Sequence, residues 1–191
     1  EARTFFSSRS NPLVMLYRIN AGRIPADHWV QDPDVGGGRV IGEVCHFVDD
    51  MHALCASPPT SVFASSVGRH SSGITEDQCS LSLTFGDGSI GTIIYTAEGS
   101  SALQKEHFEA HADGMSLVMS DFMETRTYHN GKSALFKTAK RDKGFAQEMA
   151  QFVQAIEQGL PPVIPFEQID AVTRACLLAV RSLSSGVAYP L

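Results

Sequence analysis

His46 is the residue whose surroundings in the sequence best suit acid–base chemistry. It lies in the segment GGGRVIGEVCHFVD, residues 36–49, and apolar residues at three- and four-residue spacing predict a helix over residues 39–55. His46 falls outside the apolar stripe, and three carboxylates stand three or four residues away on its own side: Glu43, Asp49 and Asp50. A neighbouring carboxylate favours the imidazolium and orients the ring, as a general acid or base requires. Spacing alone favours a solvated helix face, whereas the preceding glycines, which let a ligand or another backbone come close, favour a site.

Other patterns in the sequence resemble functional motifs but are better explained by structure. Residues 86–91, GDGSIG, fit the dinucleotide-binding pattern G-x-G-x-x-G, yet β-branched residues follow them where that motif requires a helix. A hairpin turn is therefore predicted there. His107, Glu109 and His111 alternate along an expected strand and share one face, which could hold a divalent metal. Because no adjacent segment supplies further ligands, we expect a solvated strand face and no metal site.

The composition is typical of one compact soluble domain. The chain has 191 residues, of which 43% are hydrophobic and 19% charged, and its formal net charge of -6 argues against binding nucleic acid phosphates. Four cysteines without metal-binding spacing predict buried thiols in a reducing compartment, and hence a cytoplasmic protein: Cys45, Cys55, Cys79 and Cys176. Neither a membrane span nor a signal peptide is visible, and the chain does not begin with Met, so we expect a fragment.

The order of the predicted elements indicates an α+β domain. The expected strands cover residues 12–22, 60–69, 79–85, 90–97, 107–111, 116–119, 122–128 and 133–138. An irregular loop is expected over 22–38, a polar loop over 70–77, and hairpin turns at 86–89 and 129–132. Two amphipathic helices follow, one capped by Asp142 and ending at Gly159, the other covering 166–185. Their apolar stripes are expected to pack on the sheet. The prediction is an open, mainly antiparallel β-sheet with helices packed on one face.

The segment GGGRVIGEVCHFVD resembles the part of Gfo/Idh/MocA (glucose-fructose oxidoreductase) family proteins in which glycines lead into a helix bearing a catalytic His. Three more stretches are similar to the family's C-terminal domain: YRINAGRIPADHWVQDP, SLVMSDFMETRTYHNGK and KGFAQEMAQFVQAIEQGLPPVIPFEQIDAVTRACLLAVRSL. The resemblance is collinear over nearly the whole chain. The Gly-Glu-Val-Cys-His-Phe form of the motif resembles a subgroup in which some members are fused to a zinc alcohol dehydrogenase-like domain.

The resemblance implies a dihydrodipicolinate reductase-like fold for residues 1–191, a single substrate-binding and oligomerisation domain. It implies that an N-terminal Rossmann domain, absent from this chain, binds NAD or NADP, and that substrate lies between the two. His46 would then act on the hydroxyl of a sugar, nucleotide-sugar or cyclitol in an NAD(P)-dependent dehydrogenase, and the isolated domain would be inactive. Many members carry an Asp four residues before the His. Gly42 stands there in this sequence, and Glu43 beside it is the possible substitute.

Further residues are expected near the substrate because of their position: Arg18, Asn20, His28, Trp29, Gln31 and Lys143. Arg18 ends the first strand and would suit a carboxylate or phosphate. Trp29 lies in the loop before the glycines, where it either stacks on a sugar ring or base or anchors the loop in the core. Lys143 precedes a helix and either approaches the site or is solvated.

The expected partners are a small-molecule substrate, the Rossmann half of the parent chain and further copies of this chain, which would meet through the uncovered face of the sheet. No nucleic acid or membrane partner is expected. The competing hypothesis is a non-catalytic binding or oligomerisation module of the same fold, which the absence of Asp at position 42 favours.

Overall fold

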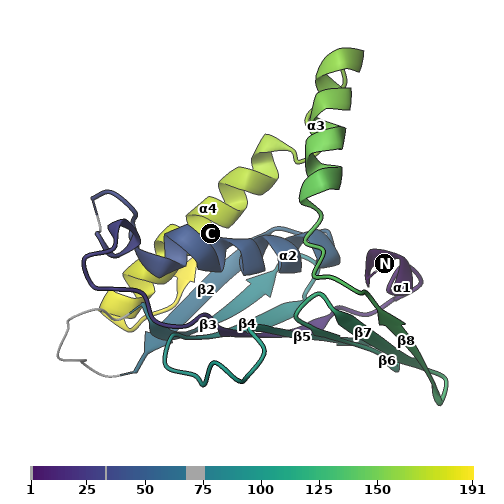
Figure 1. Ribbon diagram of the computed structural model, residues 1–191, viewed down its shortest axis with the longest axis horizontal. Coiled ribbons are helices and arrows are strands. Elements are labelled where there is room, and N and C mark those ends of the chain that lie inside the picture. Colours follow the sequence, from purple (N-terminus) through teal and green to yellow (C-terminus); the bar gives the residue numbers. More distant parts are fainter. Residues whose placement is uncertain (1, 33, 68–75) are drawn as a thin grey trace.

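A sheet of nine strands with helices on one face forms the body of the protein (Figure 1). The computed structural model describes residues 2–32, 34–67 and 76–191. Its strands, in chain order, are β1 Val14–Asn20, β2 Pro59–Ser66, β3 Gln78–Phe85, β4 Ile90–Thr96, β5 Glu106–Ala112, β6 Met115–Ser120, β7 Glu124–His129, β8 Lys132–Lys137 and β9 Tyr189–Pro190. Its helices are α1 Ala2–Phe5, the 3-10 helix η1 Trp29–Gln31, the π-helix η2 Val40–Val44, α2 Cys45–Cys55, α3 Phe145–Gln158 and α4 Phe166–Ser185.

The strand order is β8-β7-β6-β5-β1-β4-β3-β2-β9, and only β1 and β4 run parallel. The predicted open, mainly antiparallel sheet is thereby confirmed. The hairpin from β3 to β4 also forms as predicted, because Gly88 adopts a φ of 88° that favours glycine. Strand β2 confirms the prediction for residues 60–69 as far as Ser66, whereas most of the loop expected at 70–77 lies outside the described residues.

Strand β1 shows how the alternating pattern places the core. Leu13, Met15, Tyr17 and Ile19 are all buried, and the Tyr17 ring contacts Phe47 of α2, so they lie on the face that the helices cover. Residues between them, such as Val14, point to the uncovered face and stay accessible. This alternation agrees with the sequence prediction, and it fixes which face of the sheet can meet α2.

Helix α2 packs on the sheet through a fully buried methionine, Met51. The predicted helix over residues 39–55 is confirmed, although its first turn is the π-helix η2. Met51 reaches β4 where Gly91 leaves room, since a Cβ added at Gly91 would lie 2.5 Å from the Met51 sulfur. The absence of a side chain at position 91 therefore sets how closely α2 approaches the sheet.

Gly91→Ala is expected to lower the free energy of unfolding by about 1–3 kcal/mol, because the added methyl group overpacks the contact with Met51. Urea unfolding would measure this loss. Thr92→Ala, on the uncovered face of the same strand, is the matched control and is expected to change stability by less than about 1 kcal/mol. Equal stabilities of the two variants would contradict this description of the packing.

The structure contradicts the predictions for helix α3. This helix buries none of its residues and stands away from the body (Figure 1), so its stripe does not pack on the sheet. Gly144, with a φ of 80°, is its N-cap, and Asp142 instead accepts a hydrogen bond from the Gly144 N–H at 2.9 Å. An apolar stripe shows that a helix has an apolar partner without showing which partner it is, and this explains the wrong expectation.

Helix α4 follows the prediction, because most of its stripe packs against α2 and β2. Ser182 is fully buried there, and its hydroxyl accepts a hydrogen bond from the Ala64 N–H at 2.8 Å. Among the described residues, no helix is both long and apolar enough to cross a membrane.

Candidate active site

Glu43 joins the start of α2 to the sheet. Its carboxylate accepts hydrogen bonds from the Lys105 ammonium at 2.5 Å and from the Tyr95 hydroxyl, and Arg39 lies 3.5 Å away. Burial opposes ionisation of Glu43, but these donors and positive charges outweigh it and hold its pKa below the ordinary value. Tyr95 is buried beside this carboxylate, so its pKa is raised and it remains a donor.

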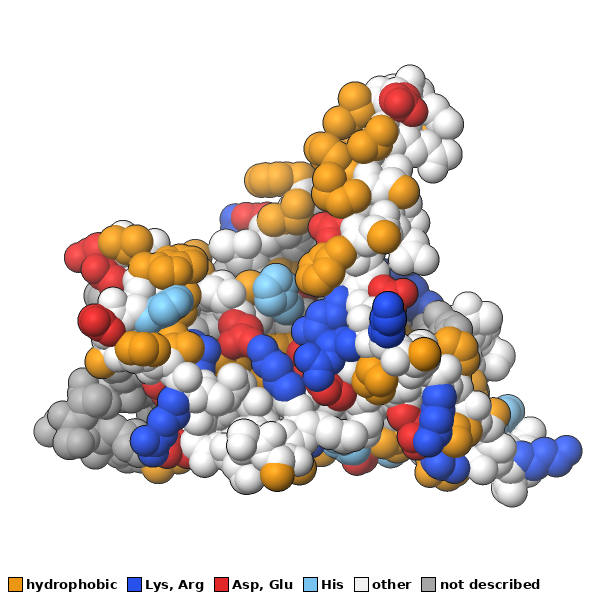
Figure 2. Space-filling model, in the orientation of Figure 1, with side chains coloured by type: hydrophobic (Ala, Val, Ile, Leu, Met, Phe, Trp, Pro, Cys, Tyr) orange, Lys and Arg blue, Asp and Glu red, His pale blue; other side chains and the backbone are white. Residues whose placement is uncertain are grey.

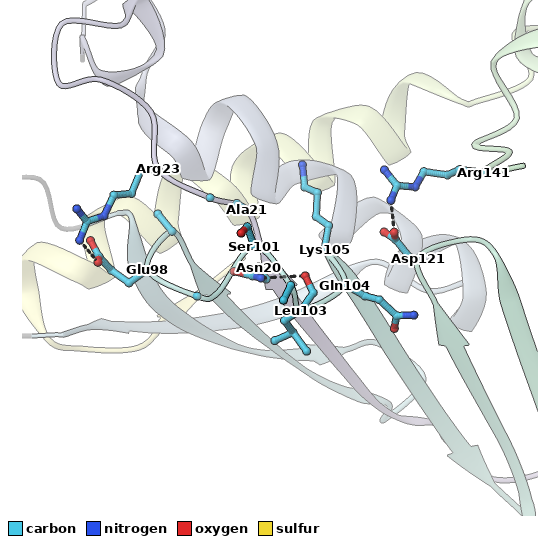
Figure 3. Close-up of a pocket in the computed structure, with 14 residues that line it drawn as sticks. Asn20, Ala21, Arg23, Glu98, Ser101, Leu103, Gln104, Lys105, Asp121 and Arg141 are labelled. Atoms are coloured by element: carbon cyan, nitrogen blue, oxygen red, sulfur yellow. Dashed lines mark hydrogen bonds and ion pairs between the residues drawn. The ribbon is translucent and has the colours of Figure 1, made fainter.

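A pocket of about 730 Å³ opens beside this ion pair, at the carboxyl ends of the parallel strands β1 and β4. Figure 3 shows the Lys105 side chain and the ion pair between Arg141 and Asp121 at its border. Asn20 also lines this pocket, and its side-chain amide donates to the carbonyls of Ser100 at 2.8 Å and Leu103 at 3.2 Å. The lining is about half polar and half apolar, which suits a ligand that has hydroxyl groups on a carbon framework.

The contacts of Glu43 form one polar group, and a second polar group lies further along α2. The Tyr17 hydroxyl is 3.3 Å from the Asp50 carboxylate, and Lys143 pairs with the buried Glu106 at 2.6 Å. Desolvation by the surrounding protein raises the pKa of Asp50 to about 6, and the nearby carboxylates add to this rise, while the Tyr17 hydrogen bond and the Lys143 charge oppose it. Burial and the carboxylates of Asp50 and Glu106 raise the pKa of the Tyr17 hydroxyl.

His46 lies between these two polar groups. It stands three residues after Glu43 of η2 and four before Asp50, so all three share one side of the continuous helix that η2 and α2 form. Its side chain is exposed, and within the described part of the chain its imidazole has no hydrogen-bond or ion-pair partner. Asp49 is turned the other way, because its carboxylate accepts a hydrogen bond from Gln168 of α4 at 2.7 Å. His46 is therefore free to meet a ligand.

No carboxylate at position 42 or 43 contacts His46, because position 42 is glycine and Glu43 has other partners. The Glu43 carboxylate is taken up by Lys105, Tyr95 and Arg39, so the structure does not bring it into contact with the imidazole. A Cβ added at Gly42 would meet only Val30 Cγ1 at 3.6 Å and the Gly36 carbonyl at 3.9 Å, which are ordinary contacts. Crowding therefore does not explain why position 42 lacks a side chain.

The glycines before α2 bring two backbones together. A Cβ at Gly36 would lie 2.5 Å from the Val30 Cα, so only glycine fits. The first backbone amide of η2 already has a partner, because the Val40 N–H donates to the Glu76 carboxylate at 2.7 Å. A negative charge at this position opposes a pyrophosphate, so the residues present do not fit a dinucleotide there.

The other predicted substrate residues are placed differently from one another. Arg18 lies on the uncovered side of β1, where it donates to the Gln104 carbonyl at 2.6 Å, so the structure does not bring it together with His46. Lys143 does reach the acidic group around Glu106 and Asp50. Lys143 therefore lies on the same side of the sheet as His46.

The loop before the glycines leaves its tryptophan in solvent. Trp29 is 60% exposed, so the expectation that it anchors the loop in the core is wrong, and its ring is open to stacking. His28 accepts a hydrogen bond from the Val30 N–H at 3.3 Å, and Gln31 donates to Asp77 at 3.1 Å. Both polar residues therefore brace the loop itself.

His107, Glu109 and His111 share one strand face as predicted. The His107 and Glu109 side chains are hydrogen-bonded at 2.8 Å on the uncovered side of the sheet. In residues 2–32, 34–67 and 76–191, no group of three or more His, Cys, Asp or Glu is arranged to hold a metal ion. All four cysteines are free thiols, and burial raises the pKa of Cys55 to about 11.

The sequence analysis missed Lys105 and Glu106, which connect both polar groups to β5. Alternation along β5 puts Glu106 on the same face as Phe108 and Ala110, toward the core. A carboxylate at an inward position is unusual unless it is paired. That mismatch was the signal available in the sequence.

Asp50→Asn is expected to stabilise the protein above about pH 6 and to leave stability unchanged below about pH 4. A carboxyl whose pKa is raised on folding binds its proton more tightly in the native state. Stability of the wild type therefore falls as pH rises through that pKa, and Asn abolishes this fall. Since Asp50 keeps contact with solvent, the effect is small and its sign is the test. Urea unfolding at both pH values measures it; a variant less stable at the higher pH would contradict the environment described.

The comparison with known proteins identifies the family. Residues 13–117, more than half of the chain, match the model of the GFO/IDH/MocA C-terminal domain. The chain belongs to the Gfo/Idh/MocA oxidoreductase family. The match includes β1, η2 and α2, so His46 and Glu43 both lie inside it. No curated protein matches the chain.

Solved structures share the fold of this Gfo/Idh/MocA domain. Aldose-aldose oxidoreductase from Caulobacter crescentus, in complex with glycerol, has a TM-score of 0.84 at 14% identity, with 100% of this chain and 59% of that chain covered. Levoglucosan dehydrogenase with NADH and levoglucosan has a TM-score of 0.80 at 16% identity, with 100% and 62% covered. UDP-N-acetylglucosamine 3-dehydrogenase GnnA from Acidithiobacillus ferrooxidans has a TM-score of 0.75 at 17% identity, with 94% and 56% covered. The chain thus spans about three fifths of the length of these proteins.

Proposed function

We propose that this chain is the substrate-binding and acid–base part of an NAD(P)-dependent oxidoreductase. Its substrate would be a hydroxyl-bearing sugar, nucleotide-sugar or cyclitol. The observation that carries this proposal is the free, exposed imidazole of His46, which stands three residues after Glu43, whose partner Lys105 lines the pocket. The family and the sugar-related names of the matched structures support the substrate class.

In this proposal His46 handles the proton of the reacting hydroxyl. The imidazole takes the proton from the hydroxyl oxygen during oxidation and returns it during reduction, a role that a positioned histidine commonly has. Lys105, held by Glu43 at 2.5 Å, would donate to substrate oxygens at the pocket border. Glu43 then acts as a positioning residue, because its contacts lie with Lys105 and Tyr95.

The basic side chains near the site are each paired with an acid. Lys105 pairs with Glu43 and Lys143 with Glu106, while Arg141 pairs with Asp121. An anionic group would have to compete with these carboxylates, whereas hydroxyl groups can add hydrogen bonds to them. The exposed ring of Trp29 would supply a further contact to a sugar, whereas the buried Asn20 would hold the pocket loop through Ser100 and Leu103. Among the proposed substrates, neutral polyhydroxylated ones therefore fit this half best.

The proposal requires a second half of the parent protein. An N-terminal Rossmann domain would bind NAD or NADP and supply the hydride acceptor, so the chain alone would be inactive. The uncovered sheet face would join copies of the protein, since it exposes Val14, Ile90 and Ile94 beside polar residues.

The test is NAD(P)H formation or consumption by the full-length parent across a panel of sugars, sugar nucleotides and cyclitols. Turnover by the parent and none by the 191-residue chain is expected. No turnover with any member would favour the alternative, a non-catalytic binding or oligomerisation module, to which the absence of an acid at position 42 points. Turnover by the 191-residue chain alone would contradict the proposal that an N-terminal Rossmann domain is required for activity.

A further inference from the structure

Helix α3 carries an apolar stripe that nothing covers. Five large apolar side chains at three- and four-residue spacing form this stripe: Phe145, Met149, Phe152, Val153 and Ile156. Phe145 is 69% exposed and Ile156 66%, values far above those of a helix that has its partner. Orange side chains run along one side of α3 in Figure 2. A solvated helix with such a stripe is only marginally stable by itself, so we expect the stripe to bind a partner.

The stripe continues into a groove. The connection after α3 and the start of α4 turn back beside it, and together they line a groove of about 740 Å³. Leu160, Val163 and Ile169 contribute exposed apolar side chains to this groove. The apolar surface is therefore contiguous over two helices and their connection, which is typical of a surface that binds another folded unit.

The polar side of α3 indicates a protein partner. Between Phe145 and Gln158 the helix has glutamines and two glutamates but no Lys or Arg. A helix that lies on a membrane surface normally carries basic residues on its polar side, where they meet anionic lipids. A neutral to acidic rim instead suits a protein surface.

The position of α3 relative to His46 suggests which protein this is. Lys143, which lies two residues before α3, pairs with Glu106 at 2.6 Å in the polar group beside His46. Figure 2 shows basic, acidic and histidine side chains gathered at the foot of α3, on the face that α3 rises from. A folded domain bound to the stripe would therefore lie over the face of this domain that presents His46.

We propose that the α3 stripe and its groove are the seat of the nucleotide-binding half of the parent protein. This inference rests on the proposed function. The matched structures extend well beyond this chain, which covers 59% to 62% of two of them while matching over its whole length. A half that belongs to the same polypeptide reaches the stripe at high effective concentration. Docking on α3 would bury the stripe and set the cofactor opposite His46 in the same step.

Cysteine labelling in the full-length parent tests this seat. Ile156→Cys places a thiol in the stripe, and Gln154→Cys places one on the opposite side of α3 as the matched control, both with half-buried Cys45 replaced by Ser. In the parent, Ile156→Cys is expected to react at least about tenfold more slowly than Gln154→Cys, because only the stripe is covered. In the monomeric 191-residue chain the two thiols are expected to react at similar rates.

Equal labelling rates in the parent would overturn the inference. So would protection of Ile156→Cys in the 191-residue chain that appears together with dimers in light scattering, since a second copy would then be the occupant. Labelling requires no turnover. A parent that protects the stripe but turns over no substrate contradicts the proposed function alone, whereas an active parent with an unprotected stripe contradicts this inference alone.

Discussion

His46→Ala in the full-length parent is expected to lower kcat by about 10²- to 10⁴-fold, the range typical of a lost general acid or base. The imidazole is exposed and has no partner among the described residues, so its removal disturbs no hydrogen bond of the fold. Thermal unfolding is therefore expected to stay unchanged while turnover falls. Steady-state kinetics with NAD(P)H absorbance measures the effect.

The matched control for this variant is His129→Ala. His129 is also exposed, but it ends β7 in a hairpin at the far edge of the sheet from α2. We expect this variant to keep wild-type kcat. A His46→Ala enzyme whose kcat lies within about twofold of wild type would remove His46 from the acid–base role.

Arg39→Met is expected to have the largest effect on stability, a loss of about 3 kcal/mol in the free energy of unfolding. The Arg39 side chain is almost fully buried at the start of the helix that carries His46. It lies 3.1 Å from Asp77, 3.5 Å from Glu43 and 5.4 Å from the centre of the Tyr95 ring, and it donates to the Gly22 carbonyl. Methionine fills similar space but leaves these carboxylates without their buried cation. Urea unfolding of wild type and variant measures the loss.

Arg174→Met is the control for the loss of an arginine in general. Arg174 pairs with Asp170 one turn away on α4, and both side chains are largely exposed. Such a pair contributes about 0–0.5 kcal/mol, so this variant is expected to match the wild type. Equal losses for the two variants would show that the buried network around Arg39 does not stabilise the domain.

Local pattern was sufficient to predict most of the fold. Period-two alternation gave the buried face of β1, and spacing of apolar residues gave α2 and α4 with nearly their observed ends. Helix α3 is amphipathic as predicted, but the expectation that its apolar stripe packs on the sheet is wrong. Periodicity reports that a face is apolar, whereas its partner depends on tertiary contacts that no local pattern encodes.

The site was predictable in part, for a similar reason. Neighbours on one helix put Glu43 and Asp50 on the side of His46, and the structure retains this arrangement. The partners of these carboxylates are far away in the sequence: Tyr17 lies in β1, and Lys105 immediately precedes β5. Pairing across the sheet decides those contacts, so the sequence could show which groups need partners but not which residues provide them.

The most direct test of the proposed function follows the hydrogen on the reacting carbon of the substrate. The full-length parent would be mixed with NAD(P)⁺ and a substrate deuterated at that carbon, and a single turnover would be analysed by mass spectrometry. We predict that the deuterium appears on the reduced nicotinamide, and that His46→Ala transfers it about 10²- to 10⁴-fold more slowly. A reduced cofactor without deuterium, or equally fast transfer by His46→Ala, would contradict the proposal.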